Sequence, residues 1–272
     1  MIIRPGNHQH IGDRKEQQDA FGFSDLSDAA LVEHGGVLAL VADGMGGLLE
    51  GAEASCIAVL AFLESYGKKN AEEPIEDALD RSLQEANNAV HAFALERNLV
   101  GNCGTTLVAV VAHESGVYWI YAGDSRLYVT DGQSLTPLTE DHIYANKLKK
   151  AVEKGLLRPE EALAHPERDA LTSYIGDSVI EIVGKGCLRS SPDGLPPDGF
   201  LLLLCSDGLY KTLSEKQILE TYTPDPEVWA RTLVETTIAQ KSLFQDNVTV
   251  LCLAAAPLYP VEAYRRISIE RL

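Results

Sequence analysis

Leu201-Leu202-Leu203-Leu204-Cys205-Ser206-Asp207-Gly208 is an unbroken apolar run that ends at an aspartate. The same pattern occurs earlier in the chain, at 38–44 and again at 119–125. A fourth aspartate, Asp246, stands just before the apolar run 248–253. Runs of this length and composition predict buried strands. Each of these strands therefore presents a carboxylate at the rim of a sheet.

Carboxylates that gather at the rim of a sheet repel one another, and they cannot all stay ionised unless positive charge holds them. Hard divalent cations supply that charge, because they prefer oxygen ligands. Taken singly, an Asp-Gly pair also has a purely structural interpretation as a hairpin turn, since Gly readily adopts positive φ. Asp43 and Asp207, however, follow near-identical apolar runs, and each precedes a glycine that lets the backbone approach a ligand closely. The repetition favours a metal site.

The composition limits what kind of protein this is. The 272 residues suffice for one large domain or two small ones, and with 45% hydrophobic residues the chain can bury a sizeable core. No apolar stretch approaches the ~18 residues that a membrane-spanning helix needs, and residues 1–7 show no signal-peptide pattern, so we expect a cytoplasmic protein. The net charge of -17 argues against nucleic acid or an anionic membrane as a partner. The scattered cysteines form no C-x-x-C pair, which gives no support for a zinc or redox motif.

Hydrophobic periodicity predicts helices and antiparallel strands. Apolar residues recur at helical spacing after Pro74, which suits a first helical turn, and they predict a helix over Ile75–Glu96. Further helices are predicted near 51–66, 215–221 and 227–240. The strands 107–112 and 117–122 are joined by a short polar loop, which requires antiparallel pairing. The chain therefore has the pattern of an α+β domain in which helices cover antiparallel sheet.

One long segment interrupts the predicted strands. The stretch 144–177 is charged and is predicted to be mostly helical, with Pro159 and Pro166 as interruptions. It separates the middle strands from the run that begins at Leu201. An insertion beside a site often contacts the substrate, so this stretch is a candidate flap.

Seven short motifs follow one another along the chain. They are Arg14…Gln18-Asp19-Ala20, Val41-Ala42-Asp43-Gly44-Met45-Gly46-Gly47, Gly104-Thr105-Thr106-Leu107, Ala122-Gly123-Asp124-Ser125-Arg126, Leu138-Thr139-Glu140-Asp141-His142, Cys205-Ser206-Asp207-Gly208-Leu209 and Asp246-Asn247-Val248-Thr249-Val250. In this order they resemble the metal-dependent serine/threonine protein phosphatases of type 2C, the PPM family, in their bacterial form. The resemblance extends from Arg14 to Val250.

The resemblance implies an α+β fold in which two antiparallel β-sheets pack as a sandwich, flanked by helices on both sides (αββα). It implies a single phosphatase domain over residues 1–272. Within that domain we expect a flap-like insertion at about 143–177 and a short C-terminal tail at about 257–272.

The resemblance also implies a binuclear centre of two Mn²⁺ or Mg²⁺ ions. By motif position, Asp43 bridges the two ions and the carbonyl of Gly44 binds one of them. Asp207 and Asp246 complete the other shell, and Asp19 acts directly or through water. Two such cations lower the pKa of a water that they share, so the family needs no Ser, Cys or His nucleophile.

Two further residues have roles implied by the resemblance. Asp124, together with Asp207, holds a weaker third ion near the flap. Arg14 binds the substrate phosphate, and the planar fork of an arginine suits that contact. The implied substrates are proteins phosphorylated on Ser or Thr, the implied role is to oppose a Ser/Thr kinase, and we expect a monomer.

Some positions depart from the family pattern or have other interpretations. Met45 stands where eukaryotic members carry a histidine proposed as general acid, and Ser242-Leu243-Phe244-Gln245 replaces the glycines expected before Asp246. His142 is expected to make a structural hydrogen bond, and Arg126 to pair with a nearby carboxylate. Two alternative functions stay open: a non-catalytic module of the same fold that binds phosphoproteins, and a metal-dependent small-molecule phosphatase or phosphodiesterase.

Overall fold

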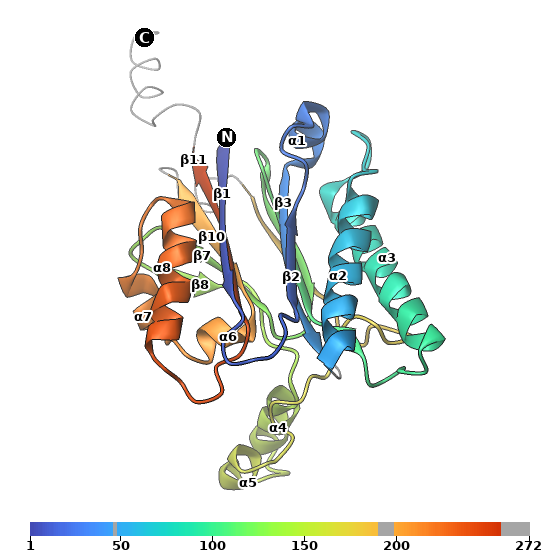
Figure 1. The fold of residues 1–272 in the computed structure, drawn as a ribbon, viewed down its shortest axis with the longest axis vertical. Coiled ribbons are helices and arrows are strands. Elements are labelled where there is room, and N and C mark those ends of the chain that lie inside the picture. The colour runs from blue at the N-terminus through green and yellow to red at the C-terminus, as the bar shows by residue number, and fades with distance from the viewer. Residues whose placement is uncertain (46–47, 190–198, 257–272) are drawn as a thin grey trace.

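Two antiparallel β-sheets stacked face to face form the centre of the computed structural model, and helices cover the outer face of each sheet (Figure 1). The structure describes residues 1–45, 48–189 and 199–256. The predicted αββα sandwich of the α+β class is confirmed by this arrangement.

The first sheet joins the two ends of the described chain. Its strands are β1 (Ile2–His10), β7 (Arg126–Thr130), β8 (Leu135–Pro137), β10 (Phe200–Cys205) and β11 (Val248–Ala256). They lie in the order β1-β11-β10-β7-β8, and each neighbouring pair is antiparallel. β1 pairs with β11 over its whole length, from Ile2 opposite Ala256 to His10 opposite Val248. β1 is not among the strands predicted from the sequence.

The second sheet carries the strand that ends at Asp43 and Gly44. Its strands are β2 (Asp19–Phe23), β3 (Val37–Met45), β4 (Gly104–Thr105), β5 (Leu107–His113), β6 (Gly116–Ala122) and β9 (Gly184–Arg189). They lie in the order β2-β3-β5-β6-β9, and β4 pairs with the end of β3. The short loop between β5 and β6 forms the antiparallel hairpin that the sequence predicts.

The helices lie over the two outer faces and at the two ends of the sandwich. They are α1 (Ala29–Gly35), α2 (Leu48–Tyr66), α3 (Ile75–Glu96), α4 (Tyr144–Glu153), α5 (Pro159–Leu163), α6 (Asp207–Tyr210), α7 (Glu215–Glu220) and α8 (Pro226–Ala239). Figure 1 shows α1 at the upper end, α2 and α3 on one outer face, α7 and α8 on the other, and α4 and α5 projecting from the lower end. α3 has the predicted bounds, whereas α2 begins three residues earlier than the predicted start at Gly51.

The central strands are apolar on both faces because each face is buried. In β3, Leu38 and Leu40 pack under α2 and α3, whereas Val41 faces the other sheet. In β10, Leu203 packs toward α8, whereas Leu202 lies between the sheets. Successive side chains of a strand point to opposite faces. Burial of both faces therefore explains why these runs are continuous rather than alternating.

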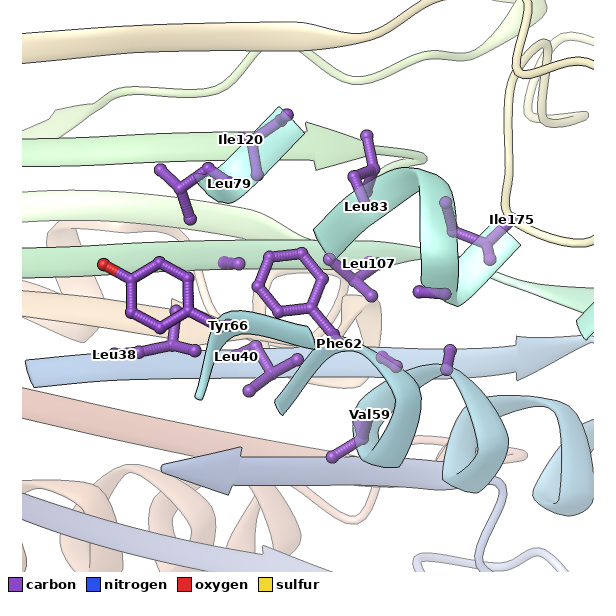
Figure 2. Close-up of a cluster of buried hydrophobic side chains, with 14 of the residues drawn as sticks. Leu38, Leu40, Val59, Phe62, Tyr66, Leu79, Leu83, Leu107, Ile120 and Ile175 are labelled. Carbon is purple, nitrogen blue, oxygen red and sulfur yellow. The ribbon is translucent and has the colours of Figure 1, made fainter. Parts of the chain in front are cut away.

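Two aromatic residues of α2 fill the layer between the helices and the second sheet. Figure 2 shows Phe62 and Tyr66 among the leucines of β3 and β5, including Leu40 and Leu107. Both aromatic side chains are fully buried. The Tyr66 hydroxyl donates a hydrogen bond to the carbonyl of Gly35 at 2.6 Å, so the only polar atom of that side chain is satisfied.

Two local predictions are wrong. The Asp43-Gly44 pair lies inside β3 rather than in a hairpin turn, because Gly44 pairs with Thr105 of β4 and the strand continues. The stretch 144–177 is helical only in α4 and α5. Near the end of the stretch the chain pairs with a strand instead of forming a helix: two backbone hydrogen bonds join Ile175 to Thr105, at 2.8 and 2.9 Å.

Two parts of the predicted sequence pattern lie outside the residues that the structure describes. Gly46 and Gly47 of the second motif and the predicted tail at 257–272 lie outside the described residues. Within the described ranges, no helix combines the length and the apolar character that crossing a membrane requires.

The core of the helix layer gives a stability prediction. We expect Phe62→Ala to lower the free energy of unfolding by about 3–5 kcal/mol, because it removes a fully buried aromatic ring and leaves a cavity. The matched control is Leu60→Ala on the same helix, whose side chain is 61% exposed. That control should change stability by less than about 0.5 kcal/mol. Urea denaturation followed by circular dichroism measures both, and equal effects would contradict the layering described above.

Candidate metal centre

Aspartates from both sheets meet at the lower end of the sandwich in Figure 1, where β3 and β10 end and β2 and β11 begin. The register of β2 and β3 places Asp19 directly opposite Asp43. The Ser206 hydroxyl, at the end of β10, donates a hydrogen bond to Oδ2 of Asp19 at 2.7 Å. This bond links the two sheets, and it places the next residue, Asp207, at the same seam.

The backbone of Asp43 is fixed on both sides. Its N–H donates to Oγ1 of Thr106 at 3.0 Å. Its carbonyl accepts from the N–H of Thr106 and from Oγ1 of Thr105, both at 2.9 Å. These threonines come from the Gly104–Leu107 motif, whose function the sequence leaves unspecified. Their hydroxyls hold the predicted bridging aspartate in place without using its carboxylate.

Asp207 and Asp246 are each paired with a cationic side chain. Nη2 of Arg14 lies 2.6 Å from Oδ2 of Asp246. The Lys211 ammonium donates to Oδ2 of Asp207, one helical turn away. These contacts bring Arg14 to the carboxylates. They also introduce Lys211, which the sequence reasoning missed.

Gly44, whose carbonyl is a predicted metal ligand, occupies a place where no side chain fits. A Cβ on Gly44 would lie 2.0 Å from the carbonyl oxygen of Gly51 and 2.8 Å from that of Gln18. A Cβ on Gly51 would in turn lie 2.8 Å from the side-chain amide nitrogen of Gln18. The two glycines therefore allow the start of α2 to approach the end of β3 and the residue before Asp19.

Asp124 lies in the loop after β6 and is held by a network of aromatic and charged side chains. The Tyr210 hydroxyl donates to the carbonyl oxygen of Asp124 at 3.0 Å and to its Oδ2 at 3.2 Å. The guanidinium of Arg126 lies 3.6 Å from the centre of the Tyr210 ring. Arg126 also makes two hydrogen bonds to Asp141, at 2.8 and 2.7 Å. This confirms the prediction that Arg126 pairs with a carboxylate, and the pair supports the ring that positions Asp124.

His142 joins this region to the base of the predicted flap. Its ring Nδ1 accepts a hydrogen bond from the backbone N–H of Gly123 at 3.2 Å, and its backbone N–H donates to the Gly123 carbonyl at 3.0 Å. The imidazole stacks on Tyr121, with 4.8 Å between ring centres. Burial lowers the pKa of His142, which favours the neutral imidazole that accepts at Nδ1. The structural role predicted for His142 is confirmed.

Burial and mutual repulsion perturb three of the carboxyl groups. Burial raises the pKa of Asp19 to about 7, although the hydrogen bond from Ser206 opposes the shift. Burial, together with the charges of Asp19, Asp207, Asp124 and Asp246, raises the pKa of Asp43 well above its ordinary range. Burial and the charge of Asp207 raise the pKa of Asp124 to about 6. Five aspartates therefore share one electrostatic environment.

The chemistry of these residues fits divalent cations. Oδ1 of Asp19 and Oδ1 of Asp207 are buried and have no hydrogen-bond partner among the described residues. Buried carboxylate oxygens without partners are costly, and a hard cation satisfies them. Across the described ranges, no three acidic, histidine or cysteine side chains already converge as a complete ligand set. Oδ1 of Asp207 can bind a cation while Oδ2 stays paired with Lys211.

Comparison with known proteins identifies the family of this chain. The family model of protein phosphatase 2C matches residues 7–245. The chain belongs to the protein phosphatase 2C family. A relative is the serine/threonine phosphatase stp of Listeria monocytogenes, 31% identical over 218 residues, which are 79% of this chain and 82% of the relative. The predicted family resemblance is therefore confirmed, and the chain is a phosphatase enzyme of this family.

Solved structures agree with this assignment. The serine/threonine phosphatase PstP/Ppp of Mycobacterium tuberculosis superposes with a TM-score of 0.73 at 27% identity, over 94% of this chain and 100% of that chain. A structure of the PstP catalytic domain in complex with two manganese ions gives a TM-score of 0.71 at 27% identity, over 94% and 99% of the two chains. The protein phosphatase 2C fold of this chain thus has a solved counterpart with two manganese ions.

The perturbed carboxyl groups give a pH prediction for the chelator-treated protein. Aspartate in an unfolded chain has a pKa of about 3.9, whereas the pKa of Asp19 is raised to about 7 and that of Asp124 to about 6. Between about pH 4 and pH 7 the native state therefore holds protons that the unfolded state has lost, so the free energy of unfolding falls as pH rises.

Urea denaturation at several pH values measures this slope. Asp19→Asn should flatten it, because the amide does not titrate. Excess Mn²⁺ should reverse it, because metal ligands bind in their deprotonated form. A chelator-treated protein whose stability rises from pH 5 to pH 7 would contradict the electrostatic description of this centre.

Proposed function

We propose that this protein hydrolyses phosphoserine and phosphothreonine esters in proteins at two Mn²⁺ or Mg²⁺ ions held by the aspartate cluster. Asp43 is the proposed bridging ligand, with the Gly44 carbonyl, Asp207, Asp246 and Asp19 as further ligands. The observation that carries the proposal is the gathering of aspartates at the seam of the two sheets, where Asp19 lies opposite Asp43 and is hydrogen-bonded to Ser206, the residue before Asp207. Burial and the charges of the other aspartates raise the pKa of Asp43. Such a cluster needs cations in order to be ionised at neutral pH.

When bound, the two cations supply Lewis-acid charge and lower the pKa of a water molecule that attacks phosphorus. The residues of the chain orient that chemistry. The threonine hydroxyls at Thr105 and Thr106 fix the backbone of Asp43, and Ser206 holds Asp19 across the two sheets. These bonds leave one oxygen of Asp19 free of other partners in the described structure. The backbone of Asp43 and the carboxylate of Asp19 are therefore held in place before a phosphate arrives.

Arg14 is the proposed phosphate-binding residue. Its side chain is 52% exposed, and its only hydrogen bond within the described residues joins Nη2 to Asp246. A guanidinium has five N–H donors, so the remaining donors can receive phosphate oxygens. The Asp246 carboxylate positions the guanidinium for that contact. The positive charge of Arg14 would attract an anionic group at this point of a protein whose net charge is -17.

Asp124 is the proposed ligand of a weaker third ion beside the flap. His142, which precedes α4, is bonded to Gly123 on both its backbone and its ring. Burial raises the pKa of Tyr210, so its hydroxyl keeps the proton that it donates to Asp124. We propose that the segment 143–177 acts as a flap over this end of a single domain.

The cellular role is proposed from the family. We propose a monomeric, cytoplasmic enzyme that opposes a Ser/Thr kinase. The phosphoprotein substrate is supported by relatives named as phosphatases, the serine/threonine phosphatase stp of Listeria monocytogenes and the protein phosphatase PhpP of Streptococcus pneumoniae. The former is similar over 82% of its own length and the latter over 85%.

The metal assignment gives a prediction for Asp207. We expect Asp207→Asn to lower kcat for an aryl phosphate with Mn²⁺ by more than about 100-fold, since even residues that only support metal ligands cost 10–100-fold. The matched control is Asp80→Asn, because Asp80 is an exposed carboxylate paired with Lys185. That control should keep wild-type activity, and both proteins should unfold cooperatively. Wild-type turnover in Asp207→Asn, or activity that survives thorough chelation, would remove the metal mechanism.

Arg14 gives a separate prediction about substrate binding. Arg14→Ala should lower kcat/KM by about 30–100-fold, the loss expected for charge-assisted hydrogen bonds to phosphate. Arg14→Lys should recover only part of the activity, because an ammonium cannot bind phosphate through a planar fork. Steady-state kinetics on a phosphothreonine peptide distinguishes the variants. Equal kcat/KM for Arg14→Ala and the wild type would place the phosphate elsewhere.

A further inference from the structure

The loop between α8 and β11 displays two large apolar side chains beside the candidate metal centre. Leu243 and Phe244 are each 89% exposed, more than any other large hydrophobic side chain in the described structure. Phe244 stands only two residues before Asp246. In Figure 1 the connection after α8 lies at the lower end of the sandwich, the end from which α4 and α5 project.

The backbone of this loop is strained at Phe244. Its φ is 60°, in the left-handed region that residues other than glycine rarely occupy. Lys241, at the start of the same loop, has a φ of 53°. A bulky residue in this conformation costs stability, and such outliers persist where the surrounding structure determines them. The strained residue carries a ring that contributes almost nothing to the core.

The residue after Phe244 is clamped to the protein. The Gln245 N–H donates to Oδ2 of Asp13 at 3.0 Å, and its carbonyl accepts from the Asp13 N–H at 2.8 Å. Nε2 of Gln245 donates to the carbonyl of Gly208 at 3.1 Å, and its Oε1 accepts from Thr212 at 2.9 Å. Gln245 is buried. The loop is therefore anchored directly beside the two exposed side chains, which limits their freedom to fold back.

We propose that Leu243 and Phe244 form an apolar ridge that contacts an apolar side chain of the phosphoprotein substrate, close to its phosphorylated residue. This inference rests on the proposed function, because it takes the phosphate to bind at Arg14 and the metal centre. Residues Leu243 and Phe244 set the sequence preference of the enzyme, and they take no part in the chemical step.

The distances along both chains fit this contact. Two residues of chain span at most about 7 Å, so the Cα atom of Phe244 lies within about 7 Å of the Cα atom of Asp246. The side chain of Phe244 extends beyond that distance. Arg14 contacts Asp246 at 2.6 Å. An extended peptide advances about 3.3 Å per residue. A side chain one to three positions from the phosphorylated residue therefore reaches the ridge when the phosphate lies at Arg14.

The charge of the protein gives the ridge a purpose. An anionic phosphopeptide is repelled by a surface with a net charge of -17. Apolar contact provides affinity that does not depend on charge, because it comes from the removal of apolar surface from water. The preference should consequently persist at high salt, where contacts between exposed charges weaken.

The test uses phosphothreonine peptides with polar flanks, in which leucine replaces each flanking residue in turn from two before to three after the phosphorylated position. The full-length enzyme with Mn²⁺ should prefer at least one leucine peptide over the polar parent by about tenfold in kcat/KM, within the range that one apolar contact provides. The variant L243Q/F244N should lose this preference. Asparagine is chosen because it tolerates the left-handed conformation.

Three further measurements complete the test. Hydrolysis of a small aryl phosphate should be unchanged in L243Q/F244N, and Leu60→Gln on α2 should keep the peptide preference. Fluorescence anisotropy should show the same preference in binding, which tests the ridge even if the proposed function fails and no probe is hydrolysed. Equal binding and turnover of all peptides by the wild type would overturn the inference. So would a preference that survives in the variant, or a variant that changes only the oligomeric state by light scattering.

Discussion

Repulsion among aspartates at the seam between two sheets is the constraint on which the rest of this structure depends. Asp43 is partly buried near four other carboxylates, and the charges of all four raise its pKa. No soluble fold gains stability from such a cluster by itself. The protein offsets part of the repulsion with Arg14 and Lys211, which pair with Asp246 and Asp207. Divalent cations can offset the remaining repulsion, and such cations also activate water for phosphate hydrolysis.

The surrounding fold supplies the rigidity that this cluster needs. Strands buried on both faces carry the aspartates at their ends. Hydroxyl groups of neighbouring residues hold the side chain of Asp19 and the backbone of Asp43. Ser206 joins the two sheets through Asp19, while Thr105 and Thr106 fix the backbone of Asp43. Gly44 lets α2 approach without a steric clash. The loop at 241–245, by contrast, is anchored through Gln245 and exposes the apolar side chains of Leu243 and Phe244. We propose that the rigid aspartate cluster and this exposed pair together bind the substrate.

Much of this arrangement could be predicted from the sequence, because helices and buried strands leave a regular pattern of apolar residues within a short stretch of chain. The bounds of α3 followed from its apolar spacing and from Pro74. Contacts between distant residues could not be predicted. The hydrogen bond of Ser206 to Asp19 spans 187 positions in the chain, and the stretch 164–177 is shaped by long-range bonds such as that of the Asn87 amide to the carbonyl of Asp177. Lys211, two residues after the Asp207-Gly208-Leu209 motif, was missed because its pairing depends on the helical turn at α6.

The most direct test of the central claim is the position of manganese in crystals of this protein, located by anomalous X-ray scattering. The account predicts two strong peaks that both contact the carboxylate of Asp43, with Asp207 and Asp246 as further ligands. Manganese bound elsewhere, with Asp43 contacting neither ion, would contradict it.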